Sequence, residues 1–186
     1  MITFGAKYIT TSNIQRFGRD SKYHDQKVSF IKFLPESTQD KLVINSIASW
    51  DVFSSYAKNI SDSFNNKVLH KDDYDSEFYA LTTQKDKFEC IEPESVLGII
   101  QTSKRKKDRY IEYLQTNPEY KFGESMRGFK GIGKVLVQTV LSIIGPDKIV
   151  QLDSDESAVG FYKKLGFIEY NDSEFNEEDY LMSIKT

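Results

Sequence analysis

The sequence has few of the residues that build covalently linked or metal-linked folds. Among its 186 residues there is one cysteine, Cys90, and there are two histidines, His24 and His70. A single cysteine excludes an intrachain disulfide and a cysteine-ligated zinc site, and the two histidines lack the spacing of metal ligands. We therefore expect a fold that depends on packing and a site without a metal.

Long apolar runs and a strong excess of one charge are also absent. No segment approaches the roughly 20 apolar residues that a membrane-spanning helix needs, and no charged-then-apolar leader opens the chain, so we expect no membrane partner and a cytoplasmic location. The net charge is −3 and the pI is near 5.5, which gives no overall attraction to nucleic acid. Apolar residues make up 39% of the chain and aromatic residues 13%, enough for a real core in one domain.

Strand and helix periodicities alternate along the chain. Residues 27–34 alternate as a strand, and Ser37 can cap a helix with Asp40 three residues later. Helical stripes then extend to Phe64, and residues 65–77 are expected to form a polar loop. The remaining predicted elements are strands at 78–84, 95–104 and 109–117 (the last two as a hairpin), a helix ending at Gly145-Pro146, a strand at 148–153, a helix at 157–166 and two terminal strands.

This order predicts an α/β (α+β) fold in which helices flank a mixed, mostly antiparallel central sheet. Residues 1–26 are polar and mixed, and they contain one short candidate strand in "ITFGAKYITT". We expect them to form an N-terminal extension packed on a domain of residues 27–186.

One segment concentrates glycine just before a helix. "RGFKGIGKVLVQTVL", residues 127–141, contains Gly128, Gly131 and Gly133. The first amides of a helix have no backbone partner and lie at the positive end of its dipole, and glycine lets a phosphate approach them closely. The segment is not a Walker A loop, because Lys134 is followed by valine rather than by serine or threonine.

Two motifs in combination resemble the GNAT acetyltransferase superfamily. "GFKGIGKVLV" is similar to that family's Q/R-x-x-G-x-G/A loop, which holds the pyrophosphate of acetyl-coenzyme A, and Gly131 and Gly133 match its two glycines. "SAVGFYKKLGFIEY" is similar to the family's later A-x-x-F-Y-x-x-x-G-F segment, beside the acetyl group and the thiol. "YIEYLQTNPEY" resembles the family's fourth strand.

The resemblance implies roles for residues around the coenzyme. Main-chain amides from Phe129 to Lys134 (Phe129, Lys130, Gly131, Ile132, Gly133 and Lys134) would meet the pyrophosphate, and Lys130 and Lys134 could add charge or be simply solvated. Leu114, Gln115 and Thr116 resemble the strand end that pairs with the pantetheine arm where the sheet splays; the alternative is an ordinary sheet pair. Phe161 and Asp155 complete the implied coenzyme set. The family often has asparagine at the position of Asp155, and Phe161 also suits the core.

Two side chains are candidates for proton transfer. Tyr162 matches the tyrosine that the family often uses as general acid toward the departing thiolate; otherwise it is a half-buried aromatic on an amphipathic helix. Glu112, on the strand facing the site, could deprotonate the amine directly or through water, or could simply face solvent.

The resemblance implies an enzyme that moves an acetyl group from acetyl-CoA to a primary amine by direct attack. Transfer to another nucleophile or of a longer acyl chain stays open, as does a degenerate coenzyme A-binding or interaction domain. The acceptor would be set by residues 35–77 and by the terminal strands, which show no familiar pattern. The acidic segment 172–180 could attract a cationic substrate or form an exposed loop. A homodimer is also open.

Overall fold

The computed structural model describes residues 5–50, 55–69, 75–105, 107–120, 128–170 and 180–186. The strands are β1 (Lys7–Phe17), β2 (Tyr23–Phe33), β3 (Glu77–Thr82), β4 (Val96–Arg105), β5 (Asp108–Thr116), β6 (Phe129–Lys130), β7 (Ile149–Ser154), β8 (Ile168–Glu169) and β9 (Tyr180–Lys185). The α-helices are α1 (Thr38–Ile47), α2 (Tyr56–Leu69), α3 (Ile132–Ile144) and α4 (Glu156–Lys164), with 3-10 turns η1 (Ala48–Trp50), η2 (Pro93–Ser95) and η3 (Pro118–Tyr120).

The described strands form one sheet in the order β6-β1-β2-β3-β4-β5-β7-β9-β8. The pairing of β5 with β7 is parallel, and the other described pairings are antiparallel. The predicted fold class, a mixed and mostly antiparallel sheet flanked by helices, is therefore confirmed. The predicted hairpin is also confirmed, since β4 and β5 pair from Gly98 opposite Thr116 to Arg105 opposite Asp108.

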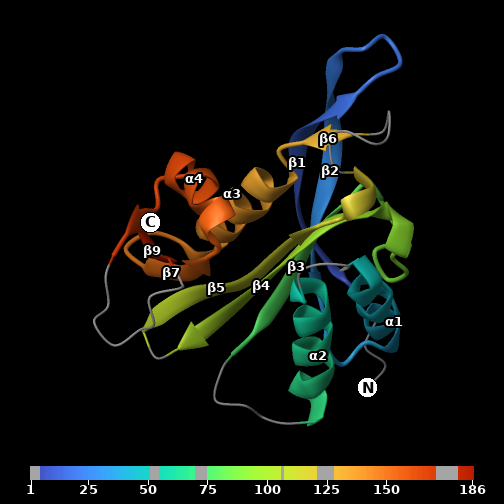
Figure 1. Ribbon diagram of the computed structural model, residues 1–186. Helices are drawn as coiled ribbons and strands as arrows, with labels where there is room; N and C mark the ends of the chain where they lie inside the picture. The colour runs from blue at the N-terminus through green and yellow to red at the C-terminus, as the bar shows by residue number, and fades with distance from the viewer. Residues whose placement is uncertain (1–4, 51–54, 70–74, 106, 121–127, 171–179) are drawn as a thin grey trace.

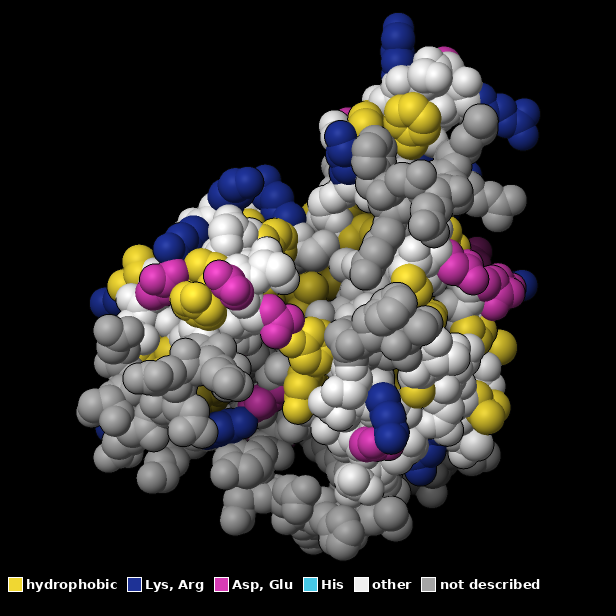
Figure 2. All heavy atoms as spheres, in the orientation of Figure 1, with side chains coloured by type: hydrophobic (Ala, Val, Ile, Leu, Met, Phe, Trp, Pro, Cys, Tyr) yellow, Lys and Arg dark blue, Asp and Glu magenta, His cyan; other side chains and the backbone are white. Residues whose placement is uncertain are grey.

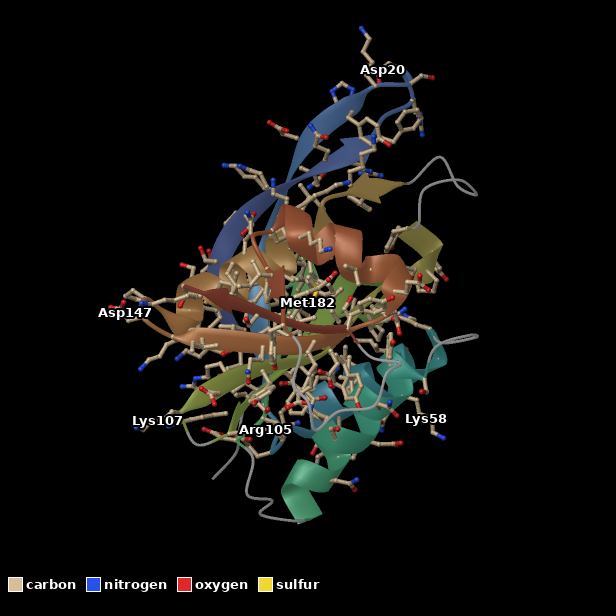
Figure 3. All side chains as sticks on the ribbon, turned by 60° about the vertical axis from the view of Figure 1, so that its left-hand side comes forward. Asp20, Lys58, Arg105, Lys107, Asp147 and Met182 are labelled. Atoms are coloured by element: carbon tan, nitrogen blue, oxygen red, sulfur yellow. The ribbon has the colours of Figure 1, made fainter. Side chains whose placement is uncertain are left out.

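Two hydrophobic clusters lie on opposite faces of the sheet (Figure 1). On one face, α1 and α2 pack on β2, β3 and β4 through fully buried residues that include Phe33, Phe64 and Phe78. On the other face, α3 and α4 cover the half of the sheet that contains Leu97 and Met182, and Figure 3 shows Met182 at the centre of this half. The sheet therefore separates two helical layers, α1 and α2 on one face and α3 and α4 on the other.

The first two strands are longer than the sequence indicates. β1 and β2 pair from Lys7 opposite Lys32 to Phe17 opposite Tyr23, and their hairpin projects beyond the rest of the sheet, with Asp20 at its tip (Figures 1 and 3). Most outer residues of this ribbon are exposed, so they lack the apolar alternation that marks a strand. β1 belongs to the same sheet; the division into an extension and a domain stays a prediction.

The predicted polar loop at 65–77 is wrong in its first part, because α2 continues to Leu69. The asparagines at the start of that stretch suggested a break. In the sequence, however, Val68 follows Phe64 by four residues, so the helical spacing of apolar residues continues.

The start of α1 confirms the predicted cap. Ser37 is the N-cap, and its hydroxyl accepts a hydrogen bond from the backbone N–H of Asp40 (3.2 Å). The Asp40 carboxylate is fully buried, and its Oδ2 accepts a bond from the backbone N–H of Leu34 (2.8 Å). Burial raises the pKa of Asp40 from 3.8 to about 6.

This buried carboxylate predicts a dependence of stability on pH. Because its folded pKa lies above its unfolded pKa, the contribution of Asp40 to stability is complete below about pH 4 and is lost as the pH rises through about 6. We expect the difference in unfolding free energy between wild type and Asp40→Asn to change by about 2 kcal/mol in favour of the variant from pH 4 to pH 7. Urea unfolding of both proteins at both pH values measures this change. An equal difference in unfolding free energy at pH 4 and at pH 7 would contradict the prediction.

Candidate functional site

The parallel strands β5 and β7 pair only where they begin. Their register covers Arg109 opposite Val150 and Tyr110 opposite Gln151. In the next residues of β5, Ile111 lies opposite Thr102 and Tyr113 opposite Gln101. Glu112 is therefore the extra residue of a β-bulge, a feature that bends a strand and redirects its side chains.

Beyond this bulge, β5 continues to pair with β4 as far as Thr116, but its pairing with β7 does not resume. Leu114, Gln115 and Thr116 thus lie where the two strands have diverged, and their contact with a pantetheine arm stays a prediction. Backbone groups on this edge of β5 face the gap rather than a ladder with β7, and an extended ligand could bond to them.

A cavity of about 320 Å³ lies at the divergence. Its walls come from both faces of the sheet: Phe161 and Tyr162 belong to α4, whereas Tyr56 and Tyr113 lie on the α2 side. Figure 2 shows a hollow at the boundary between the α4 side and the α2 side, with hydrophobic side chains in it and acidic side chains along its left rim. Side chains from both faces of the sheet therefore meet at one cavity.

The glycine-rich segment forms the start of α3 beside this cavity. Gly131 is the N-cap with φ 88°, and a Cβ added there would meet nothing within 4 Å. The N-cap Gly131 has no side chain to cap α3, and the first turn of the helix contains no acidic residue. The first amides of the helix, including that of Ile132, therefore lie at a positive helix end without an acidic side chain in its first turn, which suits an anion.

Gly133 has a packing reason as well. An added Cβ would lie 3.3 Å from Cζ of Phe161 and 3.7 Å from Cδ2 of Leu114. The start of α3, the end of β5 and α4 therefore meet at this one position. Gly98 in β4 provides similar room, because a Cβ there would lie 2.8 Å from Cγ2 of Ile132.

The two predicted lysines lie in different surroundings. Lys130 is in β6, opposite Gln15 of β1, and its ammonium lies 3.8 Å from the ring centre of Tyr23. Phe129 is also in β6, where its ring packs against Tyr120. Lys134 is exposed in the first turn of α3, where an ammonium would lie beside a bound anion.

Tyr162 is a buried aromatic side chain of the cavity wall that carries a hydroxyl. It is 8% exposed, its ring packs between Phe161 and Phe167, and its hydroxyl bonds to no residue that the structure describes. Burial, and to a smaller extent the charge of Asp155, raise the pKa of Tyr162 to about 12. The phenol is therefore a proton donor, not a phenolate, at any physiological pH.

Glu112 also lines the cavity, but its carboxylate is already engaged. Arg105, near the hairpin end of β4 (Figure 3), donates from Nη2 to both oxygens at 2.8 and 2.9 Å, and the Ser103 hydroxyl donates to Oε1. The Glu112 side chain is 19% exposed. These bonds fix its orientation while leaving part of it open to the cavity.

Asp155 joins the two sides of the cavity. It is the N-cap of α4, yet its side chain caps nothing. Instead, its Oδ2 accepts a hydrogen bond of 2.6 Å from the hydroxyl of Tyr56 in α2. Among the described histidine, cysteine, aspartate and glutamate residues, no group of three or more could hold a metal ion.

Comparison with known proteins identifies the family. A sequence model described as an acetyltransferase (GNAT) domain matches residues 34–182. The chain belongs to the GNAT acetyltransferase family. A search of curated proteins finds no match.

Solved GNAT structures share the fold. PaiA N-acetyltransferase from Thermoplasma acidophilum, in complex with coenzyme A, has a TM-score of 0.55 at 18% identity, covering 86% of this chain and 99% of that one. Campylobacter jejuni N-acetyltransferase PseH, in complex with acetyl coenzyme A, has a TM-score of 0.53 at 16% identity, covering 85% and 98%. A ribosomal-protein-alanine N-acetyltransferase from Escherichia coli has a TM-score of 0.55 at 13% identity, covering 85% and 93%. These identities support the fold alone.

Sequence reasoning missed several residues that line this GNAT cavity, and three of them have side chains suited to binding or proton transfer. Tyr56 and Tyr113 form its α2-side wall, and Asp153 lies at the end of β7. In the sequence, Tyr56 belongs to the apolar stripe of a packed helix, and nothing there indicates that its hydroxyl reaches a residue 99 positions away. Asp153 ends a short apolar strand, a position that could have suggested a site.

The acidic segment 172–180 lies outside the described residues except for Tyr180. No helix in the described ranges is long and apolar enough to cross a membrane.

Proposed function

We propose that this GNAT protein is an acetyl-CoA-dependent N-acetyltransferase that acts on a primary amine. The observation that carries the proposal is the cavity between the diverged strands β5 and β7, into which the buried Tyr162 faces beside the uncapped start of α3. The fold supplies a place for a long, phosphate-bearing coenzyme, and the cavity supplies a place for its reactive end.

The residues present fit coenzyme A. We assign the pyrophosphate to the amides of Ile132, Gly133 and Lys134, with added charge from the Lys134 ammonium. Gly131, with its positive φ, turns the chain into α3 at this point. The backbone of Leu114, Gln115 and Thr116 would bond the pantetheine arm, and Phe161 would pack beside it. We do not assign Phe129 and Lys130 to direct contacts, because both are engaged in β6.

The chemistry of the reaction defines what the side chains must do. The amine lone pair attacks the thioester carbonyl carbon, the C–S bond breaks, the nitrogen loses one proton and the departing sulfur gains one. No covalent bond to the enzyme is needed, so catalysis depends on positioning and on the handling of these two protons.

Tyr162 suits the donation to sulfur. With a pKa of about 12, the phenol is always protonated, but it is a weaker acid than an ordinary thiol, whose pKa is about 8.5. It therefore stabilises the developing thiolate first by a hydrogen bond. Full transfer of its proton becomes favourable only as the same burial raises the proton affinity of the sulfur.

Glu112 is our proposed base. Its carboxylate lies on the bulge of β5 and accepts hydrogen bonds from Arg105 and Ser103, which hold it at the cavity. It could take the proton of the amine directly or through one water molecule. These same bonds occupy lone pairs on both carboxylate oxygens, which the amine or the water molecule must share.

Coenzyme binding predicts a thermal shift. Saturating acetyl-CoA should raise the Tm by about 5 to 10 °C, as expected for about 2.7 kcal/mol of binding linkage in a chain of this size. Gly131→Asp should abolish the shift, because it places a carboxylate where the pyrophosphate belongs. Gly131→Asn is the matched control, since it imposes the same backbone strain without the charge and should keep part of the shift. Wild-type protein that shows no shift would refute the coenzyme assignment.

The role of Tyr162 predicts a loss of rate without a loss of binding. Tyr162→Phe keeps the ring and removes only the hydroxyl, and we expect kcat to fall by about a hundredfold or more, with the Tm shift by acetyl-CoA retained. Tyr110→Phe removes a hydroxyl from the same sheet outside the cavity and serves as control. If Tyr162→Phe matches wild type, Tyr162 only packs. Coenzyme binding without turnover of any amine would favour a coenzyme-binding domain over an enzyme.

The role of Glu112 predicts a change in the pH profile. Gln has nearly the same shape but cannot take a proton, so Glu112→Gln should lower kcat/KM at pH 6 and approach wild type at pH 9, where a larger fraction of the amine is already neutral. The profile is measured with any accepted amine between these values. Overlapping curves would remove Glu112 from the mechanism and leave water as the base.

A further inference from the structure

We infer that Asp155 binds a positively charged group of the acceptor, so that the acceptor is an amine that carries a second cationic group. The inference rests on the proposed function and concerns the same cavity. It depends on how Asp155 is oriented, on the charges of the cavity wall and on the aromatic side chains next to it.

The orientation of Asp155 is unusual for its position. An aspartate at a helix N-cap normally accepts bonds from the first amides of the helix, but Asp155 makes no such bond at the start of α4. Its Oδ2 is held by the Tyr56 hydroxyl at 2.6 Å, and its Oδ1 accepts no hydrogen bond from any described residue. The carboxylate lines the cavity with one oxygen available, and a carboxylate forms its strongest bonds with charged donors.

The charges of the wall favour a cation. Three carboxylates line the cavity, those of Glu112, Asp153 and Asp155, and no lysine, arginine or histidine is among its described lining residues. Glu112 is already paired with Arg105. Lys58, in the first turns of α2, is exposed and points away from the sheet (Figure 3). The wall therefore attracts a cationic acceptor and repels an anionic one.

The aromatic side chains favour an alkylammonium group as the charged part of the acceptor. The rings of Tyr56 and Tyr113 lie 5.9 Å apart on the α2 side, and an ammonium group is attracted to the face of such rings. Independently of the acidic residues, Tyr162 is 8% exposed as a residue, lines the cavity and has a hydroxyl with no partner among the described residues, as expected where a ligand completes its bonding.

The reaction requires different charge states at the two amines of such an acceptor. The reacting nitrogen must be neutral to attack, and a carboxylate bonded to it would oppose the loss of its proton. Asp155 therefore acts on the other, charged end of the acceptor. The acceptor class that meets these conditions is an aliphatic diamine or a longer polyamine, with its charged end toward Asp155 and its reacting end toward Tyr162.

The experiment compares diamines with monoamines of equal chain length. Acetyl transfer from acetyl-CoA is measured with 1,4-diaminobutane and 1,5-diaminopentane against butylamine and pentylamine. For wild type we expect kcat/KM to be about tenfold higher for each diamine. Asp155→Asn should bring this ratio close to one, mainly by raising KM for the diamine. A rise in KM for acetyl-CoA alone would instead return Asp155 to the coenzyme role that the sequence implied, and would overturn the inference. Tyr56→Phe should act in the same direction more weakly, because it frees Asp155 without removing it.

A matched control and a binding measurement complete the test. Asp86→Asn removes the same charge from an exposed loop position outside the cavity lining and should keep the wild-type ratio. With CoA in place of acetyl-CoA, 1,5-diaminopentane should raise the Tm of wild type but not of Asp155→Asn. Equal kcat/KM for diamines and monoamines, or a ratio that Asp155→Asn leaves unchanged, overturns the inference while N-acetyl transfer stands. A Tm shift by the diamine without turnover of any amine overturns the proposed function instead.

Discussion

The divergence of β5 from β7 is the constraint on which the rest of this structure depends. A sheet whose strands paired along their full length would leave no passage between its two faces. Here the ladder ends after Tyr110, and the extra residue Glu112 bends β5 away. The bulge costs local pairing, but it opens a cavity between two hydrophobic clusters that are otherwise separate. The cavity is therefore lined by α4 from one face of the sheet and by α2 from the other.

Two glycines allow α3 to pack closely against the strands beside this cavity. Gly98 allows Ile132 to approach β4, and Gly133 allows α3 to approach Leu114 and Phe161. Larger residues at these positions would push the start of α3 away from the strands. Gly131 has a different reason, a positive φ at the turn into the helix. The same short segment therefore satisfies a packing requirement and leaves helix amides open, so a structural and a functional interpretation of its glycines do not exclude one another.

Charge is distributed unevenly around the opening. The start of α3 has no acidic residue in its first turn and exposes Lys134, whereas the cavity itself is lined by carboxylates. An anionic coenzyme and a cationic acceptor would thus each meet a complementary surface. Burial within the cavity also decides the chemistry of Tyr162, whose raised pKa keeps it protonated. Its buried position therefore distinguishes Tyr162 from the exposed tyrosines elsewhere in the described chain.

The sequence by itself determined the order of elements, the mixed sheet, the cap of α1 by Ser37 and the family, because periodicity, turn residues and short motifs are local properties. It underestimated β1 and β2, whose projecting ribbon lacks a buried face, and it ended α2 too early at a polar pair of asparagines. Only the tertiary structure decided what lies around the cavity. It brought Tyr56 to Asp155, paired Glu112 with Arg105 and turned Lys130 toward Tyr23. Tyr56 and Asp155 meet only after α2 and α4 pack on opposite faces of the sheet, and the other two contacts depend on how the strands are registered and bulged. No local pattern encodes which hydroxyl or ring will face a given carboxylate or ammonium.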